Sequence, residues 1–190
     1  LEFRRVLFRS DDLKWLRRTG LESPILNCAR KGIPVLGICG GYQMLGNEID
    51  DSCGAETGEV VPGLGLLPVK TVFSLEKHRT RVKGRICAQS GIWGSVSGCE
   101  CTGYEIHMGE SRICEENAQG FIQLTNQSDL STRADGCVCE NVAGTYLHGI
   151  FDEVGFCGRL IETLCRQKGR NSAVSGQMSF WEYRQREYED

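Results

Sequence analysis

Hydrophobic and polar positions divide the chain into a helical beginning, a strand-rich middle and a helical end. Apolar residues at helical spacing predict a helix over about 10–18 and a second over about 23–31, each ended by a glycine. Residues 33–38 then form a short apolar run of the kind found in buried parallel strands. Near the other end, an apolar stripe over 155–168 predicts the clearest late helix.

Short apolar or alternating runs between these helices predict strands. They lie over residues 64–69, 71–73, 79–87, 103–108, 121–124, 137–139 and 142–147. A short helix is expected over 42–47, directly after the strand at 33–38, and a turn at 134–136. Helices and strands are thus both expected, in a chain long enough for one α/β domain.

Composition places the chain among globular proteins. It has 190 residues, of which 40% are hydrophobic and 25% charged, enough for one ordinary domain. The net charge of −3 lacks the basic surplus that nucleic-acid binding needs, so we expect no nucleic-acid partner. No apolar run approaches the roughly 20 residues that cross a bilayer, so we expect no membrane partner.

Eleven cysteines would suit a disulfide scaffold or a zinc site, and the sequence disfavours both. The number is odd, the chain is long and no secretory signal stands at its start. The closest pairs, Cys99/Cys101 and Cys137/Cys139, have a C-x-C spacing and no histidine at ligand spacing. We therefore expect no metal, and a cytoplasmic protein whose thiols stay reduced.

Residues 1–9 do not resemble a native start. The segment has no initiator methionine, and its three arginines stand without the length and the serines of a transit peptide. We interpret residues 1–9 as a foreign or misread leader and residues 10–190 as the part that belongs to the fold.

The motif Gly37-Ile38-Cys39-Gly40-Gly41 is the most distinctive short feature, because it places a cysteine in a tight turn between a strand and a helix. Such a turn lifts a nucleophile above the sheet, and glycines leave space around it. The positive end of the helix dipole favours a thiolate there, and the N–H of Gly40 is placed to stabilise an oxyanion. A buried cysteine in a glycine-rich loop is the alternative for so short a motif.

A thiol nucleophile needs a base, and His148 is the best candidate among three histidines. It follows the apolar strand at 142–147, so it lies at a strand end, as Cys39 does. The carboxyl ends of strands form the active-site edge of open α/β sheets, so the two residues are expected to meet there. His107 is the rival base, and His78 is expected to be a solvated loop residue.

Several blocks of sequence, in order, resemble the class I (triad-type) glutamine amidotransferases. They are residues 11–17, 32–46, 63–69, 103–109 and 144–152. More narrowly, they resemble the amidotransferase domain of the cobyric acid synthase family, which serves cobalamin biosynthesis. The resemblance runs from about residue 10 to the C-terminus. It implies a flavodoxin-like parallel α/β sheet with helices on both faces and with its first strand or strands missing.

The resemblance also implies a reaction. Cys39 attacks the side-chain amide of glutamine to give a γ-glutamyl thioester, and His148 activates the thiol and then protonates the ammonia. Gly40 supplies one N–H of the oxyanion hole, while a loop upstream of residue 10, which supplies the other in the family, is expected to be missing. Gln43 matches a substrate-binding position, with a surface role on the first helical turn as its alternative.

One family feature is absent from this chain. The wider class has a glutamate two residues after the histidine, where this sequence has Ile150. The cobyric acid synthase branch lacks it too, which implies a Cys–His dyad whose imidazole another group orients. Glu105 is a candidate for that role.

The implied partners lie partly outside this chain. In the family, ammonia reaches an ATP-dependent synthetase domain that amidates corrinoid side-chain carboxylates, converting adenosylcobyrinic acid a,c-diamide to cobyric acid. ATP and Mg²⁺ are therefore implied for that domain, and no cofactor for this chain, which has no phosphate-loop motif. Three alternatives stay open: a related amidotransferase acting on cobyrinic acid or a cell-wall precursor, a non-catalytic domain of the same fold, and a stand-alone cysteine hydrolase.

Overall fold

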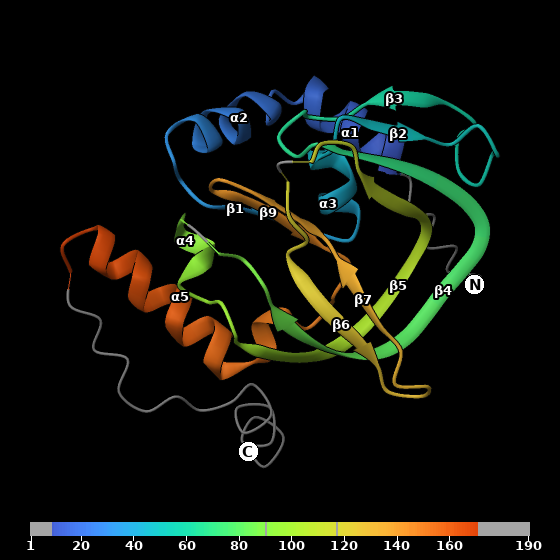
Figure 1. Cartoon of the computed structure of the whole chain (residues 1–190). Coiled ribbons are helices and arrows are strands. Elements are labelled where there is room, and N and C mark those ends of the chain that lie inside the picture. The colour runs from blue at the N-terminus through green and yellow to red at the C-terminus, as the bar shows by residue number, and fades with distance from the viewer. Residues whose placement is uncertain (1–8, 90, 117, 171–190) are drawn as a thin grey trace, which may run out of the picture.

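The computed structural model describes residues 9–89, 91–116 and 118–170 (Figure 1). Its elements, in chain order, are α1 (Arg9–Arg18), α2 (Glu22–Arg30), β1 (Val35–Ile38), α3 (Gly40–Leu45), β2 (Glu48–Asp50), β3 (Val60–Pro62), β4 (Val69–Ile86), α4 (Gly91–Gly94), β5 (Glu100–Ile113), β6 (Ile122–Asn126), β7 (Thr132–Asp135), β8 (Cys137–Cys139), β9 (Val142–Thr145), the 3-10 turn η1 (Ile150–Asp152) and α5 (Val154–Gln167). This mixture confirms the predicted α/β class. Residues 1–8 of the expected leader lie outside the described residues.

A three-stranded sheet of order β1-β9-β8 carries the motifs singled out above. Strands β1 and β9 are parallel, and β8 pairs antiparallel with β9. On one face, Val35 and Val142 pack with apolar side chains of α1, α2 and α3, and on the other, Leu36 and Ala143 pack with those of α5. Figure 1 shows this sheet between α2 and α5, so helices cover both of its faces.

A second, six-stranded sheet curls beside the first (Figure 1). Its order is β3-β2-β4-β6-β7, and β5 pairs with β4 beside this path. The 18-residue strand β4 pairs antiparallel with β5 over most of its length, with a register irregularity between Val72 and Lys77. The long β4–β5 pair brings residues 104–107 of β5 close to the carboxyl ends of β1 and β9, where Tyr104 forms a bridge with His148.

The expected parallel sheet is wrong for most strands. Among the described strands, only β1–β9 and β2–β4 pair in parallel. In β4, Val82 and Ile86 are buried while Arg81 and Arg85 are exposed, and this alternation suits an antiparallel sheet with one face in water. The alternation of polar and apolar positions in this segment therefore indicates antiparallel pairing. It was a better guide than the family resemblance, which implied a parallel sheet.

The strand expected over 64–69 is also wrong. Residues 64–68 form a turn, and only residue 69 lies in a strand, at the start of β4. The N–H of Leu64 donates to the carbonyl of Met44, and those of Leu66 and Leu67 donate to the carbonyl of Leu45, at 2.8–2.9 Å. The turn therefore satisfies the carbonyls at the end of α3, which the short helix leaves unpaired. The other expected strands and helices overlap observed elements, whereas α4, η1, β2, β3 and β7 were not predicted.

Candidate active site

Cys39 occupies a strained turn between β1 and α3. Its backbone has φ +53° and ψ −111°, in a region that residues with a side chain rarely adopt. Its N–H donates to the carbonyl of Thr145 at 2.9 Å, and its thiol donates to the carbonyl of Ile106 at 3.5 Å. The side chain is 8% exposed. The strand–cysteine–helix turn expected from the sequence is therefore present, and Gly40 begins the helix directly after it.

Two glycines allow α3 to lie against the sheet at this turn. A Cβ on Gly37 would lie 2.7 Å from the backbone nitrogen of Tyr42, and one on Gly144 would lie 2.1 Å from the Tyr42 ring. By contrast, a Cβ on Gly41 would meet nothing within 4 Å. The sequence pattern pointed to Gly37, but it did not indicate why Gly144, on the neighbouring strand, must also be small.

His148 lies three residues after β9, at the same end of the sheet as Cys39. The strands are in register, with Ile38 opposite Thr145, so both candidates follow the carboxyl ends of adjacent parallel strands. Both also contact one edge of β5. The Cys39 thiol reaches Ile106 there, and the His148 backbone pairs with Tyr104. The structure therefore brings the predicted nucleophile and base to one end of the sheet.

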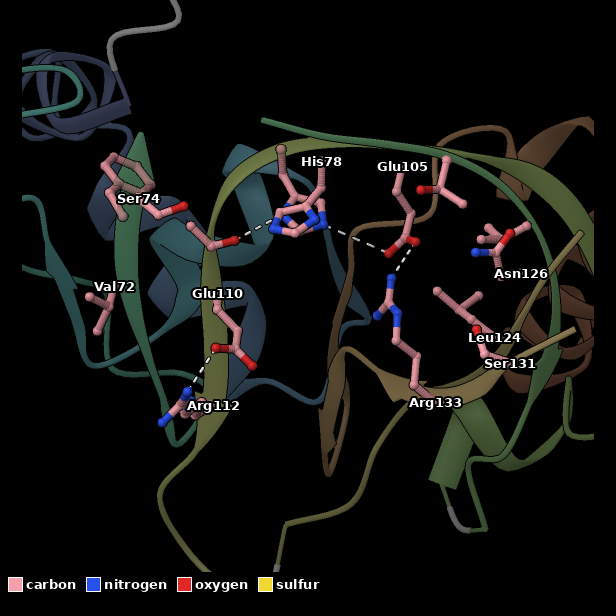
Figure 2. Close-up of a pocket in the computed structure, with 15 residues that line it drawn as sticks. Val72, Ser74, His78, Glu105, Glu110, Arg112, Leu124, Asn126, Ser131 and Arg133 are labelled. Atoms are coloured by element: carbon pink, nitrogen blue, oxygen red, sulfur yellow. Dashed lines mark hydrogen bonds and ion pairs between the residues drawn. The ribbon is translucent and has the colours of Figure 1, made fainter. Parts of the chain in front are cut away.

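Glu105 and His107 line a hollow of about 690 Å³, and Figure 2 shows the Glu105 side chain there. Arg133 binds one carboxylate oxygen of the buried Glu105, and the other oxygen lies 3.9 Å from Nε2 of His107. His78 stacks on His107 with ring centroids 5.3 Å apart. The described contacts of Glu105 are thus with Arg133 and His107, and His78 stands in the sheet, in β4, instead of in the expected loop.

The ring of His107 is held by a contact with the backbone of Gly109. Its Nδ1 lies 2.8 Å from the carbonyl oxygen of Gly109, which can only accept, so Nδ1 carries the hydrogen. Burial lowers the pKa of His107, and the bond to Gly109 and the charge of Glu105 oppose that shift. The ring of Tyr146 also stacks on that of His107, with ring centroids 3.9 Å apart. This geometry gives His107 a structural role in joining β5 to the end of β9.

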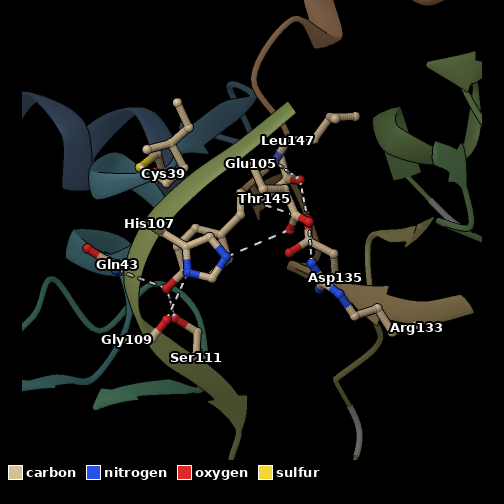
Figure 3. Close-up of polar contacts among 12 residues, drawn as sticks. Cys39, Gln43, Glu105, His107, Gly109, Ser111, Arg133, Asp135, Thr145 and Leu147 are labelled. Carbon is tan, nitrogen blue, oxygen red and sulfur yellow. Dashed lines mark hydrogen bonds and ion pairs between the residues drawn. The ribbon is translucent and has the colours of Figure 1, made fainter. Parts of the chain in front are cut away.

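Gln43 is fully buried in α3, so the alternative of a surface residue is wrong. Its Nε2 donates to the hydroxyl of Tyr146 at 2.9 Å, and that hydroxyl lies 2.6 Å from Oγ of Ser111 (Figure 3). Its Oε1 is buried and has no hydrogen-bond partner among the described residues. An amide acceptor thus remains available beside the turn that carries Cys39.

Asp135 is a buried carboxyl group that the sequence did not indicate. It accepts hydrogen bonds from the hydroxyl of Thr145 at 2.5 Å and from the N–H of Tyr146 at 3.1 Å (Figure 3). Burial raises the pKa of Asp135 to about 6, with the Thr145 bond opposing the shift and the charge of Glu105 adding to it. In the sequence, Asp135 stands in Ala-Asp-Gly, which suggests an exposed turn.

The remaining chemistry-bearing side chains do not form a metal site in the described part of the chain. None of the eleven cysteines is joined in a disulfide, and all of them lie within the described residues. Within residues 9–89, 91–116 and 118–170, no group of three histidine, cysteine or acidic side chains is arranged to hold a metal ion. Over the same ranges, no helix combines the length and the apolar character needed to cross a membrane.

A strained cysteine between a strand and a helix, with a histidine after the neighbouring parallel strand, is typical of α/β enzymes that use a cysteine nucleophile. The chain belongs to the CobB/CobQ-like glutamine amidotransferase domain family, whose model matches residues 9–156. The family expected from the sequence blocks is therefore confirmed.

Known proteins similar to this chain include cobyric acid synthases. That of Lachnoclostridium phytofermentans is 40% identical over 186 residues, which cover 94% of this chain and 36% of that protein. That of Ruminiclostridium cellulolyticum is 41% identical over 179 residues, which cover 93% of this chain and 35% of that protein. A crystal structure of a glutamine amidotransferase superposes with a TM-score of 0.47 and 16% identity, over 80% of this chain and 71% of that one. The chain spans about a third of the length of these curated relatives.

Proposed function

We propose that this chain is the glutamine-hydrolysing domain of a cobyric acid synthase and supplies the ammonia with which that enzyme amidates corrinoid side-chain carboxylates. The observation that carries the proposal is the positive φ of Cys39 in the turn between β1 and α3. Such strain persists where the surrounding structure enforces it, and it is typical of a nucleophile held above a sheet. Family membership supports glutamine as the substrate, and the similarity to cobyric acid synthases supports the acceptor class.

In the proposed reaction, Cys39 and His148 act in turn. His148 takes the thiol proton as Sγ attacks the side-chain carbonyl carbon of glutamine, and the N–H of Gly40 stabilises the oxyanion. The C–N bond breaks, His148 protonates the leaving nitrogen, and ammonia departs from a γ-glutamyl thioester. Water then adds to the thioester with His148 as base, and glutamate and the free thiol are formed.

Two further residues have proposed roles near this pair. Oε1 of Gln43 is a buried acceptor without a described partner, and an N–H of the substrate would satisfy it. Glu105 is the candidate for orienting His148. Its carboxylate is bound by Arg133 and lies close to His107, so it would have to exchange one of these contacts for His148. Both assignments depend on the resemblance to the family.

ATP and Mg²⁺ belong, in this proposal, to a synthetase domain and not to this chain. The chain has no phosphate-loop motif, and the described residues offer no cluster of metal-binding side chains. The residues present do not fit these groups, so no step here passes through them. Eleven cysteines without a disulfide suit a reducing compartment, and we place the reaction in the cytoplasm.

A domain exchange tests the whole proposal. This chain replaces the amidotransferase domain of the Lachnoclostridium phytofermentans relative, and glutamine-dependent and ammonia-dependent amidation of a corrinoid acid are compared. We expect glutamine to support amidation, and Cys39→Ser to abolish that activity while ammonia still supports it. A chimaera that uses ammonia but not glutamine, with glutamate formation also absent from the isolated chain, would contradict the proposal. Amidation of cobyrinic acid or of a cell-wall precursor instead would correct the acceptor alone.

A further inference from the structure

The His148 segment is joined to β5 by a short bridge outside the regular sheet ladders. The N–H of His148 donates to the carbonyl of Tyr104 at 2.9 Å, and the N–H of Tyr104 donates back to the carbonyl of His148 at 3.3 Å. The approach is so close that a Cβ on Gly103 would lie 1.9 Å from the carbonyl oxygen of His148. The backbone position of His148 is thus fixed against Gly103 and Tyr104.

The side chains of this bridge are stacked as well. The rings of Tyr104 and His148 have centroids 5.1 Å apart and planes within 6° of parallel. Tyr104 is 47% exposed, so the ring does not contribute to the core. A large aromatic side chain at an exposed strand position is best explained here by the imidazole that it faces, because offset stacking stabilises such a pair.

The need for such a contact follows from Ile150. The side chain two residues after His148 is apolar and fully buried, among the residues of the α5 core. It offers no acceptor that would orient an imidazole N–H. A group elsewhere in the fold must therefore limit the rotation of the ring.

The same edge of β5 also contacts the nucleophile. The Cys39 thiol is bound by the carbonyl of Ile106, two residues after Tyr104. Carbonyls two residues apart on a strand point to the same side and are spaced by roughly 7 Å. The same edge of β5 therefore fixes the positions of both Cys39 and His148.

We propose that Tyr104 is a positioning residue for glutamine hydrolysis. Its ring fixes the plane of the His148 imidazole, and its backbone fixes the place of His148 relative to the thiol bound at Ile106. This inference rests on the proposed function, in which His148 is the base. It assigns no chemical step to Tyr104, whose hydroxyl is not needed.

Two substitutions of Tyr104 in the full 190-residue chain test the role. Tyr104→Phe keeps the ring and is expected to keep a kcat for glutamine hydrolysis close to that of the wild type. Tyr104→Leu removes the ring and is expected to lower kcat roughly 10- to 100-fold with little change in KM, because misplacing a catalytic group by about 1 Å costs rates of that order. Trp15→Leu, at an exposed aromatic residue of α1, serves as the matched control and is expected to have no effect.

A structural readout separates this inference from the proposed function. We expect an NOE between the ring protons of Tyr104 and His148 in the wild-type chain, and greater reactivity of His148 towards diethyl pyrocarbonate in Tyr104→Leu. An absent NOE, a Leu variant as active as the wild type, or a Phe variant as impaired as the Leu variant would each overturn the role of Tyr104. A wild-type chain that shows the NOE but no glutamine hydrolysis would instead overturn the proposed function, and this inference with it.

Discussion

The carboxyl group of Asp135 accepts a hydrogen bond from the hydroxyl of Thr145 at 2.5 Å, and the backbone of Thr145 is bonded to the turn that carries Cys39. Thr145 in turn accepts the N–H of Cys39 through its carbonyl oxygen, and Asp135 also binds the N–H of Tyr146. One buried acid thus holds the end of β9, from which the chain continues to His148. We therefore expect the protonation of this acid to affect the stability of the fold.

The stability of the chain should depend on the protonation of Asp135. Burial raises the pKa of Asp135 in the folded state to about 6, above the 3.8 of an ordinary aspartate. The folded state therefore binds the proton more tightly, so this contribution is complete below pH 3.8 and is lost as the pH rises through about 6. Asp135→Asn does not titrate at this position. The difference between its free energy of unfolding and that of the wild type should therefore rise by up to about 3 kcal/mol from pH 4 to pH 7, in favour of the variant.

Urea unfolding of both proteins at several pH values measures this difference. Asp129→Asn is the control, because Asp129 is exposed and hydrogen bonds from Ser131 lower its pKa. That substitution should show no gain as the pH rises. A difference between Asp135→Asn and the wild type that stays constant with pH would contradict the assignment.

Gly37 and Gly41 flank the same cysteine and should differ sharply when changed to alanine. In Gly37→Ala the new methyl group would lie 2.7 Å from Tyr42 and from the side chain of Leu45, and such overpacking costs about 1–3 kcal/mol. In Gly41→Ala the methyl group meets open space within α3, and alanine is favoured in helices by roughly 0.5–1 kcal/mol. Thermal melting of both variants checks this, and equal melting temperatures would contradict the close packing of β1 on α3.

The buried bond between Gln43 and Tyr146 should contribute to stability. Tyr146→Phe leaves Nε2 of Gln43 without its acceptor in a buried site, which costs about 1–3 kcal/mol. Gln43→Leu in the same background should recover part of the loss, because no donor then remains unpaired. The double-mutant cycle is measured by denaturant unfolding, and strictly additive effects would show that the two side chains do not interact.

The sequence predicted the local parts of this site far better than the long-range ones. Cys39, its glycine and the following helix are set by neighbouring residues, so the turn follows from the motif. The pairing of β4 with β5 depends on contacts between residues far apart in the chain, and the expectation of a parallel sheet followed the family resemblance in place of the alternating polar pattern of β4.

Several site residues carry no local signal. Tyr104 and Asp135 reach the site because β5 and β7 return to the end of β9, a relationship that no spacing along the chain reveals. Gln43 was assigned from family resemblance, and its burial became visible only with the packing of α3 against Tyr146. An isolated tyrosine or aspartate in a polar stretch suggests an exposed residue, whereas Asp135 is buried.

His148 and His107 should respond differently to substitution. His148→Ala is expected to lower glutamine hydrolysis by roughly 10²- to 10⁴-fold, the usual contribution of a general base. His107→Asn keeps a donor for the carbonyl of Gly109 and is expected to keep most of the activity. Steady-state glutamate formation measures both variants. Near-normal activity of His148→Ala together with an inactive His107→Asn would exchange the two roles.

Covalent labelling with an α-amino chloroketone analogue of glutamine tests the central claim most directly. The native chain is treated with the reagent with and without excess glutamine, and the modified cysteine is located by mass spectrometry of peptides. The chain carries ten other free thiols, which act as internal controls for unselective alkylation. We predict one adduct, on Cys39, that glutamine suppresses and that is absent from Cys39→Ser. A glutamine-protected adduct on any other cysteine, with Cys39 unmodified, would contradict the account.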